Sequence, residues 1–307
     1  MIFDAHGDIL THVTMQHEQG IDIWNTYHKP KYSAAGVSGS IFVNFTDPAS
    51  ATQRDEFGAI TKVALPYFKA HPDMNIILNK DDFRLDKFNL IFGIEGMGAI
   101  ESSEELVDLY DLGYRHIGIT WNEQNDFASG TTHSGGLTAE GQKLIRKCNE
   151  LGMIVDFAHL NYQSFMEAAA VTTKPIFFSH GNVRSLCDHV RNLDDEQLQL
   201  VAQSNGIIGL AAMNFFINED KTSANIEDLV NHVVYVKEHF GIDHVGFGFD
   251  FCYYLSSSPT RNDVEGLHHI DDVANVIELL KQAGLTAEEI EKVCYKNMLR
   301  VIKEHLN

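Results

Sequence analysis

Short apolar, β-rich runs alternate with amphipathic helical stretches along this chain of 307 residues. The eight β-rich runs lie at 2–6, 37–45, 90–96, 116–120, 153–159, 175–180, 206–212 and 244–250. Helical patterns lie at about 54–70, 103–111, 138–150, 162–172, 194–204, 225–240, 271–283 and 286–305. Alternation over this length predicts an α/β fold with a parallel sheet, and eight units predict a single closed (β/α)8 barrel of the TIM type.

The chain contains no linker, low-complexity tract or charge block that would divide this barrel. We therefore expect residues 1–307 to form one domain. The first units are the weakest part of the pattern, because residues 9–36 hold no clean helical periodicity.

The charge and hydropathy of the chain limit its partners and location. The formal net charge of -20 disfavours nucleic acids and anionic membrane surfaces, which repel an acidic protein. A continuous apolar stretch of about 18 residues is missing, so no membrane insertion is expected. The first β-rich run begins at residue 2, too early for a secretory signal before it, and we expect a cytoplasmic protein with reduced cysteines.

Polar residues follow the β-rich runs at the points where the strands should end. They are His6 and Asp8 after the first run, Glu95 at the third, His159 at the fifth, His180 at the sixth and Asp250 at the eighth. The carboxyl ends of barrel strands meet at one face, where barrel active sites lie. A deep cluster of carboxylates would repel itself without cations, so we expect metal ions there.

The types of side chain indicate which metal. Three imidazoles and two carboxylates suit Zn²⁺, although manganese, cobalt or iron also fit such a set. Five ligands exceed what one catalytic zinc with an open position needs. They suffice for two ions that share a bridging carboxylate and activate water between them.

Several motifs in the same order resemble the membrane (renal) dipeptidases, peptidase family M19 of the amidohydrolase superfamily. They are DAHGD at 4–8, GIEG at 93–96, GLTAEGQKLIRKCNELGMIVDFAH at 136–159, FFSH at 177–180, VRN at 190–192, HVGFGFDF at 244–251 and NMLRV at 297–301. The resemblance spans nearly the whole chain. It implies a proteolytic metal-dependent hydrolase that acts on dipeptides and uses two Zn²⁺ per chain.

The same resemblance assigns roles to residues. It implies that His6, Asp8 and Glu95 hold one zinc, and that Glu95, His159 and His180 hold the other. Arg191 matches the arginine that reads the substrate's terminal carboxylate, and Asp250 matches the aspartate that carries the proton. Trp121 and Asn122 fall in the substrate-binding element after the fourth run.

Two positions depart from the family pattern. The Thr–His–Asn element of relatives like the renal enzyme reads Thr120–Trp121–Asn122 here, so an indole replaces the histidine that helps polarise the scissile carbonyl. His133 in the following loop is a candidate replacement. The family's Asp–Phe–Asp after the last strand reads Asp250–Phe251–Cys252. Both changes affect the expected substrate range more than metal binding.

The sequence therefore predicts a binuclear zinc dipeptidase, and relatives' tolerance of D residues extends the expected substrates to dipeptides with a C-terminal D residue. Another amide or ring hydrolase, a deaminase of the same superfamily, and a degenerate metal-binding protein stay open as alternatives. The family resemblance also leaves a homodimer open. The preferred side chains, the native metal and the physiological pathway are not determined by the sequence.

Overall fold

The computed structural model describes residues 1–220, 224–255 and 264–307. Its strands are β1 (Ile2–Gly7), β2 (Val37–Phe45), β3 (Met74–Ile76), β4 (Phe88–Glu95), β5 (Tyr114–Gly118), β6 (Ile154–Asp156), β7 (Phe177–Gly181), β8 (Ile207–Leu210) and β9 (Val245–Phe247). Its α-helices are α1 (Ile9–His17), α2 (Lys29–Ala34), α3 (Gln53–Ala70), α4 (Leu106–Leu112), α5 (Ala139–Leu151), α6 (Tyr162–Val171), α7 (Asp195–Gln203), α8 (Asn214–Ile217), α9 (Ile226–His239), α10 (Val273–Gln282), α11 (Ala287–Glu291) and α12 (Asn297–His305).

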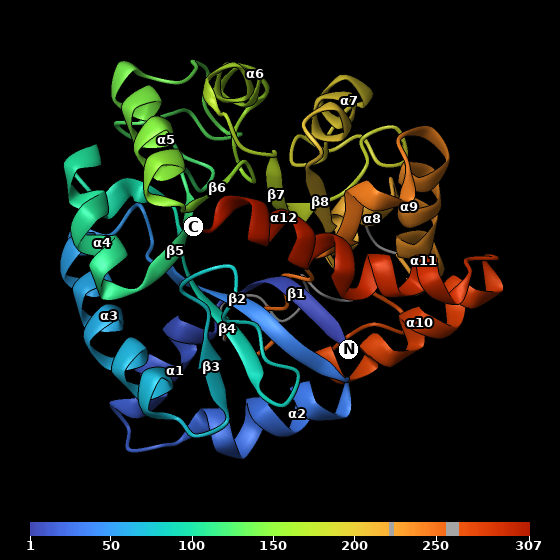
Figure 1. Cartoon of the computed structure of the whole chain (residues 1–307), viewed down its shortest axis with the longest axis horizontal. Coiled ribbons are helices and arrows are strands. Elements are labelled where there is room, and N and C mark those ends of the chain that lie inside the picture. Colours follow the sequence, from blue (N-terminus) through green and yellow to red (C-terminus); the bar gives the residue numbers. More distant parts are fainter. Residues whose placement is uncertain (221–223, 256–263) are drawn as a thin grey trace.

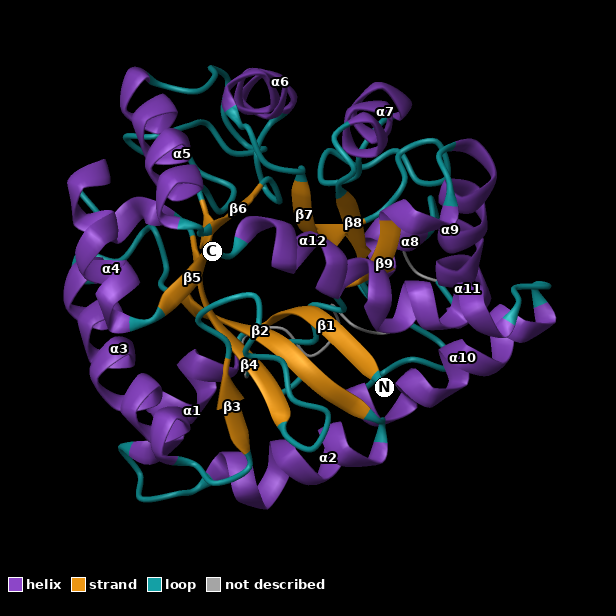
Figure 2. Ribbon diagram, viewed as in Figure 1, coloured by secondary structure: helices purple, strands orange, loops and turns teal. Residues whose placement is uncertain are grey.

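The strands close into a parallel barrel with helices around it (Figures 1 and 2). The order of paired strands is β2, β1, β9, β8, β7, β6, β5 and β4, and β2 also pairs with β4, which closes the ring. The short strand β3 pairs with the start of β4, before β5 joins it. The predicted (β/α)8 barrel is confirmed, and each predicted β-rich run contributes one strand of the ring.

Apolar side chains fill the end of the barrel where the strands begin, and α12 covers this end. Residues near the strand starts, such as Phe3, Ile41 and Phe177, form one buried cluster with Met298, Val301 and Ile302 of α12 and with Leu306. Figure 1 shows α12, in red, lying across the centre of the ring of strands. With this end packed, the polar strand ends can form a site only at the opposite end of the barrel.

The expectation that residues 9–36 hold no clean helix was wrong. The segment contains α1, a π-helical turn at Trp24–His28, and α2. Helix α1 was missed because it buries neighbouring positions such as Ile9, Leu10 and His12. Its sequence therefore lacks the single apolar stripe by which an amphipathic helix is recognised. Helix α2 spans only six residues and begins with a proline in its first turn, too short for a recognisable repeat.

Two strands of the barrel contain one extra residue near their carboxyl ends. Asp4 and Gly7 of β1 pair with Ser40 and Phe42, so three steps on β1 match two on β2. In β7, Phe178 and Gly181 pair with Ile208 and Leu210 in the same way. Such bulges redirect side chains, and these two lie at His6 and His180.

No helix in the described ranges is both long enough and apolar enough to cross a membrane. The four cysteines, Cys148, Cys187, Cys252 and Cys294, are free thiols and are buried.

The close approach of Gly248 to the bulge in β7 gives a stability prediction. A Cβ atom on Gly248 would lie 1.8 Å from the backbone oxygen of Ser179, so Gly248→Ala must displace backbone. We expect the free energy of unfolding to fall by about 1–3 kcal/mol. Urea denaturation in the presence of a chelator measures this change without a contribution from metal binding.

Gly58, in α3, is the matched control, because its added Cβ would meet no atom within 4 Å. Gly58→Ala should raise the free energy of unfolding by about 0.5–1 kcal/mol. Equal stabilities for Gly248→Ala and wild type would contradict the close packing at Ser179.

Candidate metal centre

The six polar residues predicted at strand ends gather at the carboxyl end of the barrel. His6 lies in β1, Glu95 ends β4 and His180 lies in β7, while Asp8, His159 and Asp250 follow β1, β6 and β9. All six are buried. One nitrogen or oxygen from each of His6, Glu95 and His180 lies within 4.8 Å of the other two, and the same holds for His6, Asp8 and Asp250.

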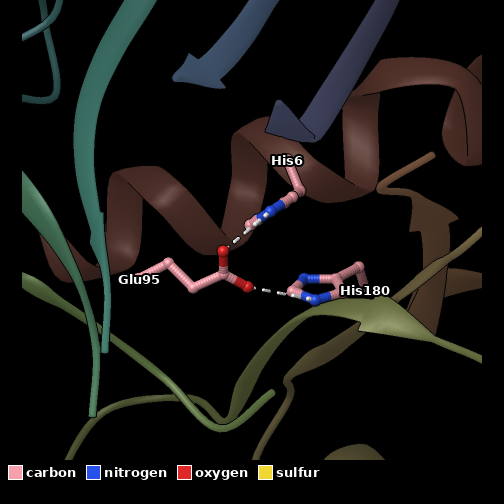
Figure 3. Close-up of side chains that lie close together, drawn as sticks. All are labelled: His6, Glu95 and His180. Atoms are coloured by element: carbon pink, nitrogen blue, oxygen red, sulfur yellow. Dashed lines mark ion pairs between the residues drawn. The ribbon is translucent and has the colours of Figure 1, made fainter. Parts of the chain in front are cut away.

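Glu95 lies between the imidazoles and presents one oxygen to each side (Figure 3). Its Oε2 lies 3.7 Å from His6 Nε2. Its Oε1 lies 2.9 Å from His159 Nε2 and 3.7 Å from His180 Nε2. The Nε2 atoms of His159 and His180 are themselves 2.9 Å apart. The donor atoms thus form two overlapping groups that share His6, and Glu95 belongs to one of them.

Two of the side chains are delivered by unusual backbone. His159 has φ of 68° and Asp250 has φ of 57°, both in the left-handed region that non-glycine residues seldom adopt. Strained conformations of this kind concentrate where a site requires a particular side-chain direction. Here they occur three residues after the ends of β6 and β9, at Asp156 and Phe247.

The electrostatics of the cluster favour a cation. Burial raises the pKa of Glu95 well above its ordinary value, and the nearby charges of Asp8 and Asp250 raise it further. Burial also lowers the pKa of His6 to about 3 and holds the pKa values of His159 and His180 well below the usual range. The imidazoles are therefore neutral at physiological pH and available as metal ligands, while the carboxylates lack sufficient positive charge.

Hydrogen bonds behind two of the imidazoles fix their orientation. His159 Nδ1 lies 3.0 Å from Asn122 Oδ1, which also accepts from the Thr131 hydroxyl at 2.9 Å. His180 Nδ1 lies 2.7 Å from Ser179 Oγ, and that hydroxyl donates to Asp156 Oδ2.

Asp156 is held as an acceptor by groups on two strands. His116 Nε2 lies 3.1 Å from its Oδ2, and its Oδ1 accepts the backbone N–H groups of Ala158 and Ser179. Burial acts to raise the pKa of Asp156, but the hydrogen bonds from His116 and Ser179 hold it below its ordinary value.

Sequence reasoning missed this set behind the ligands: His116, Asp156 and Ser179. A signal was available, because His116 and Asp156 are polar residues inside otherwise apolar runs, where a buried polar group needs a partner.

A cavity of about 590 Å³ opens beside the cluster. Its polar lining includes Asp8, Glu95, His159 and Asp250 together with the predicted substrate-binding residues Trp121, Asn122 and Arg191. His189 lines the cavity as well. His133, a candidate for the role of the family's histidine, is exposed and bonds to Thr132, and it is not among the lining residues.

A family model for membrane dipeptidases (peptidase family M19) matches residues 1–307 of this chain. The chain belongs to this family. The predicted membership of M19 is thereby confirmed, and the family of metallopeptidases supports a metal cofactor in this protein.

Curated relatives of this M19 chain include two that cover most of it. Dipeptidase tcpJ of Claviceps purpurea is 29% identical over 288 residues, which are 88% of this chain and 66% of the relative. An uncharacterized protein in the pqqA 5' region of Klebsiella pneumoniae is 32% identical over 226 residues, 70% of this chain and 81% of the relative. The chain thus spans slightly less than two thirds of the fungal protein's length.

Solved structures show the same fold. The dipeptidase AC, a metallo peptidase of family M19, superposes with a TM-score of 0.89 at 22% identity, covering 99% of this chain and 98% of that one. A metallo peptidase from Rhodobacter sphaeroides, liganded with a phosphinate mimic of the dipeptide L-Ala-D-Ala, has a TM-score of 0.89 at 21% identity and covers 99% of both chains.

The residues present fit a metal. Both ring nitrogens of His6 are buried without a hydrogen-bond partner, an arrangement that a metal ion on Nε2 would partly relieve. The donor set of imidazole nitrogens and carboxylate oxygens is the one that Zn²⁺ and similar divalent ions prefer.

Glu95 gives the prediction for this site. If the cluster binds two ions, as the sequence predicts, Glu95→Ala should disrupt both sites together, because its two oxygens face different imidazoles. Bound metal should then fall from about two ions per chain towards none. Glu95→Gln, which keeps the shape but not the charge, should also lose metal. Elemental analysis after gel filtration measures the stoichiometry. Two retained ions with near-normal turnover would show that Glu95 is not the bridge.

Proposed function

We propose that this M19 protein is a dipeptidase that holds two Zn²⁺ per chain and hydrolyses the peptide bond of dipeptides. The observation that carries the proposal is Glu95, whose Oε2 faces His6 while Oε1 faces His159 and His180. A carboxylate placed in this way can bridge two ions. His6 and Asp8 would hold one of them, and His159 and His180 the other.

The zinc ions, when bound, would lower the pKa of a water molecule bound to them and would polarise the scissile carbonyl. In this scheme the protein's own proton carrier is Asp250. Its Oδ1 lies 3.8 Å from His6 Nε2, and the residue lines the cavity. Asp250 takes the proton from the attacking water and delivers it to the leaving amine, as general base and then general acid.

Arg191 is the proposed reader of the substrate's terminal carboxylate. It lines the cavity and is only 7% exposed, and its Nε is buried without a hydrogen-bond partner. Burial lowers its pKa to about 10, which leaves the guanidinium charged at neutral pH. A charged fork with an unused donor, close to Glu95 and Asp250, suits a carboxylate at a fixed distance from the reacting bond.

The cavity also suits a substrate of two residues. Its volume of about 590 Å³ is in the usual range for small-molecule sites. Apolar and aromatic residues form much of its wall: Phe45, Trp121, Val190, Met213, Phe215, Phe216 and Leu255. Trp121 packs against Phe45 and His159, with ring centroids 5.5 and 6.2 Å apart. We propose that it acts as a wall of the substrate site.

Further parts of the proposal concern the whole protein. We propose that residues 1–307 act as one metal-dependent hydrolase domain, a range that the family match also covers. Four free cysteines support a reducing compartment such as the cytoplasm. The charge of -20 supports a small-molecule partner over nucleic acid. A homodimer stays a prediction from the family.

A substrate screen tests the activity. Purified protein with zinc is assayed on a dipeptide library that includes L–L and L–D pairs, beside lactones and nucleobases. We expect turnover of dipeptides. Faster turnover of lactones or nucleobases would instead favour another amidohydrolase, and no gain of activity on zinc reconstitution would favour a degenerate metal-binding protein.

Asp250→Asn isolates the proposed proton transfer. Asparagine tolerates the left-handed backbone at this position, so the substitution should leave the fold intact. We expect kcat to fall by roughly 10²–10⁴-fold while bound metal is unchanged. Steady-state kinetics and metal analysis on the same sample separate the two effects. Loss of metal would make Asp250 a ligand of the site beside His6.

Arg191→Ala tests recognition of the carboxylate. A charge-assisted pair in a partly buried site predicts a loss of roughly 10- to 150-fold in kcat/KM. The diagnostic measurement compares a dipeptide with its C-terminal amide. Wild type should strongly prefer the free acid, the alanine variant should lose that preference, and Arg191→Lys should recover only part of it.

Arg184 offers a matched control in the same loop, since its guanidinium pairs with Asp188 at 2.9 Å. Arg184→Ala should leave the preference for the free acid unchanged. If Arg191→Ala retains the full preference, another cation reads the carboxylate.

A further inference from the structure

The three imidazoles of the cluster differ in what holds the side of the ring that faces away from it. For His159 that group is the side-chain oxygen of Asn122, 3.0 Å from Nδ1. An amide oxygen can only accept, so Nδ1 carries the hydrogen and Nε2 keeps its lone pair for a ligand. Nε2 is the atom that faces Glu95.

A chain of two hydrogen bonds, through Ser179 to Asp156, likewise fixes the hydrogen of His180 on Nδ1. Asp156 accepts the Ser179 hydroxyl hydrogen, so Ser179 Oγ is left to accept from His180 Nδ1 at 2.7 Å. This fixes the hydrogen of His180 on Nδ1 and the lone pair on Nε2. The backbone N–H of Ser179 also donates to Asp156, so the whole unit is tied to the strand.

His6 has no equivalent support among the described residues. Neither Nδ1 nor Nε2 has a hydrogen-bond partner, although both atoms are buried. Its ring instead lies against that of His180, with centroids 4.0 Å apart and planes at 40°. Packing of this kind limits rotation of the ring but leaves the position of the hydrogen undetermined.

We propose that the two metal sites differ in affinity: the His159–His180 site binds zinc first and tightly, and the His6–Asp8 site binds second and exchanges its ion faster. The inference rests on the proposed two-metal site. Groups that orient metal-binding imidazoles are worth roughly 10- to 100-fold in affinity. Among the described residues such groups stand behind His159 and His180, and none stands behind the His6 ring. Binding of the first ion would also fix the Glu95 carboxylate for the second. At limiting zinc the protein would therefore be half-loaded.

Competition titration tests the order of binding. Metal-free protein is titrated with Zn²⁺ against a chromophoric chelator, with no substrate present. We expect two binding events of one equivalent each, the first at least about 10-fold tighter. Asp8→Asn should remove the weaker event and leave the tighter one. Loss of the tighter event in this variant would reverse the order and overturn the inference.

Two variants behind the ligands test the cause. Ser179→Ala removes the acceptor for His180 Nδ1, and Asn122→Ala removes the acceptor for His159 Nδ1. Each should weaken the tighter event by roughly 10- to 100-fold. Because Asn122 is partly exposed, its variant should fold even if a change at buried Ser179 does not. Unchanged affinity of the tighter event in both variants would overturn the inference.

Ser164→Ala is the matched control for loss of a buried hydroxyl. Ser164, in α6, is also fully buried. Its Oγ donates to the backbone oxygen of Ser129 at 2.9 Å. This variant should keep both zinc affinities, even if its unfolding midpoint falls as much as that of Ser179→Ala. Equal weakening by Ser164→Ala would show a general structural effect and contradict the role of Ser179.

The stoichiometry separates this inference from the proposed function. Binding of fewer than two ions by wild type would contradict the two-metal site itself. Binding of two ions with equal affinities would contradict only the difference between the sites.

Discussion

The arrangement of this protein depends on the burial of negative charge at the mouth of the barrel. Asp8, Glu95 and Asp250 lie close together with little access to solvent, and Arg191 is the cation that the described structure places beside them. Ionised carboxylates are costly to bury without compensation. The imidazoles that surround Glu95 are neutral and so supply ligand atoms but no charge. Divalent cations would balance the carboxylate charge and would at the same time occupy the free imidazole nitrogens.

The barrel keeps this polar cluster apart from the apolar core. Side chains near the strand starts pack against α12, whereas the polar residues occupy the strand ends and the loops that follow them. One end of the sheet can therefore be stabilised by ordinary hydrophobic packing while the other holds groups that oppose folding. The hydrogen-bonded set of His116, Asp156 and Ser179 connects the His180 imidazole to three neighbouring strands, β5, β6 and β7.

Much of this could be predicted from the sequence, because the decisive signals were periodic or local. The eight β-rich runs predicted the ring, and the polar residues at their ends predicted which side chains would meet. The helices between residues 9 and 36 were missed, since α1 is buried on neighbouring positions and shows no clear stripe. The bulges at His6 and His180 could not be predicted from the sequence either. They depend on register between strands that are distant in sequence.

The pairing of His116 with Asp156 could not be predicted from the sequence for the same reason. His116 and Asp156 are 40 residues apart, and nothing local to either residue shows that they pair. Their partnership follows from the adjacency of β5 and β6, which only the folded sheet provides. The sequence could identify them as buried polar residues in need of partners but could not say which partners they had.

The left-handed backbone at His159 and Asp250 restricts how this site can change in evolution. Glycine, asparagine and aspartate tolerate such a conformation, whereas β-branched residues do not. Most substitutions at either position therefore carry a penalty in the fold besides any loss of chemistry. A lineage that abandoned the reaction would be expected to drift there towards glycine or asparagine. The backbone would then still mark the proposed active site after the side chains that form it had been replaced.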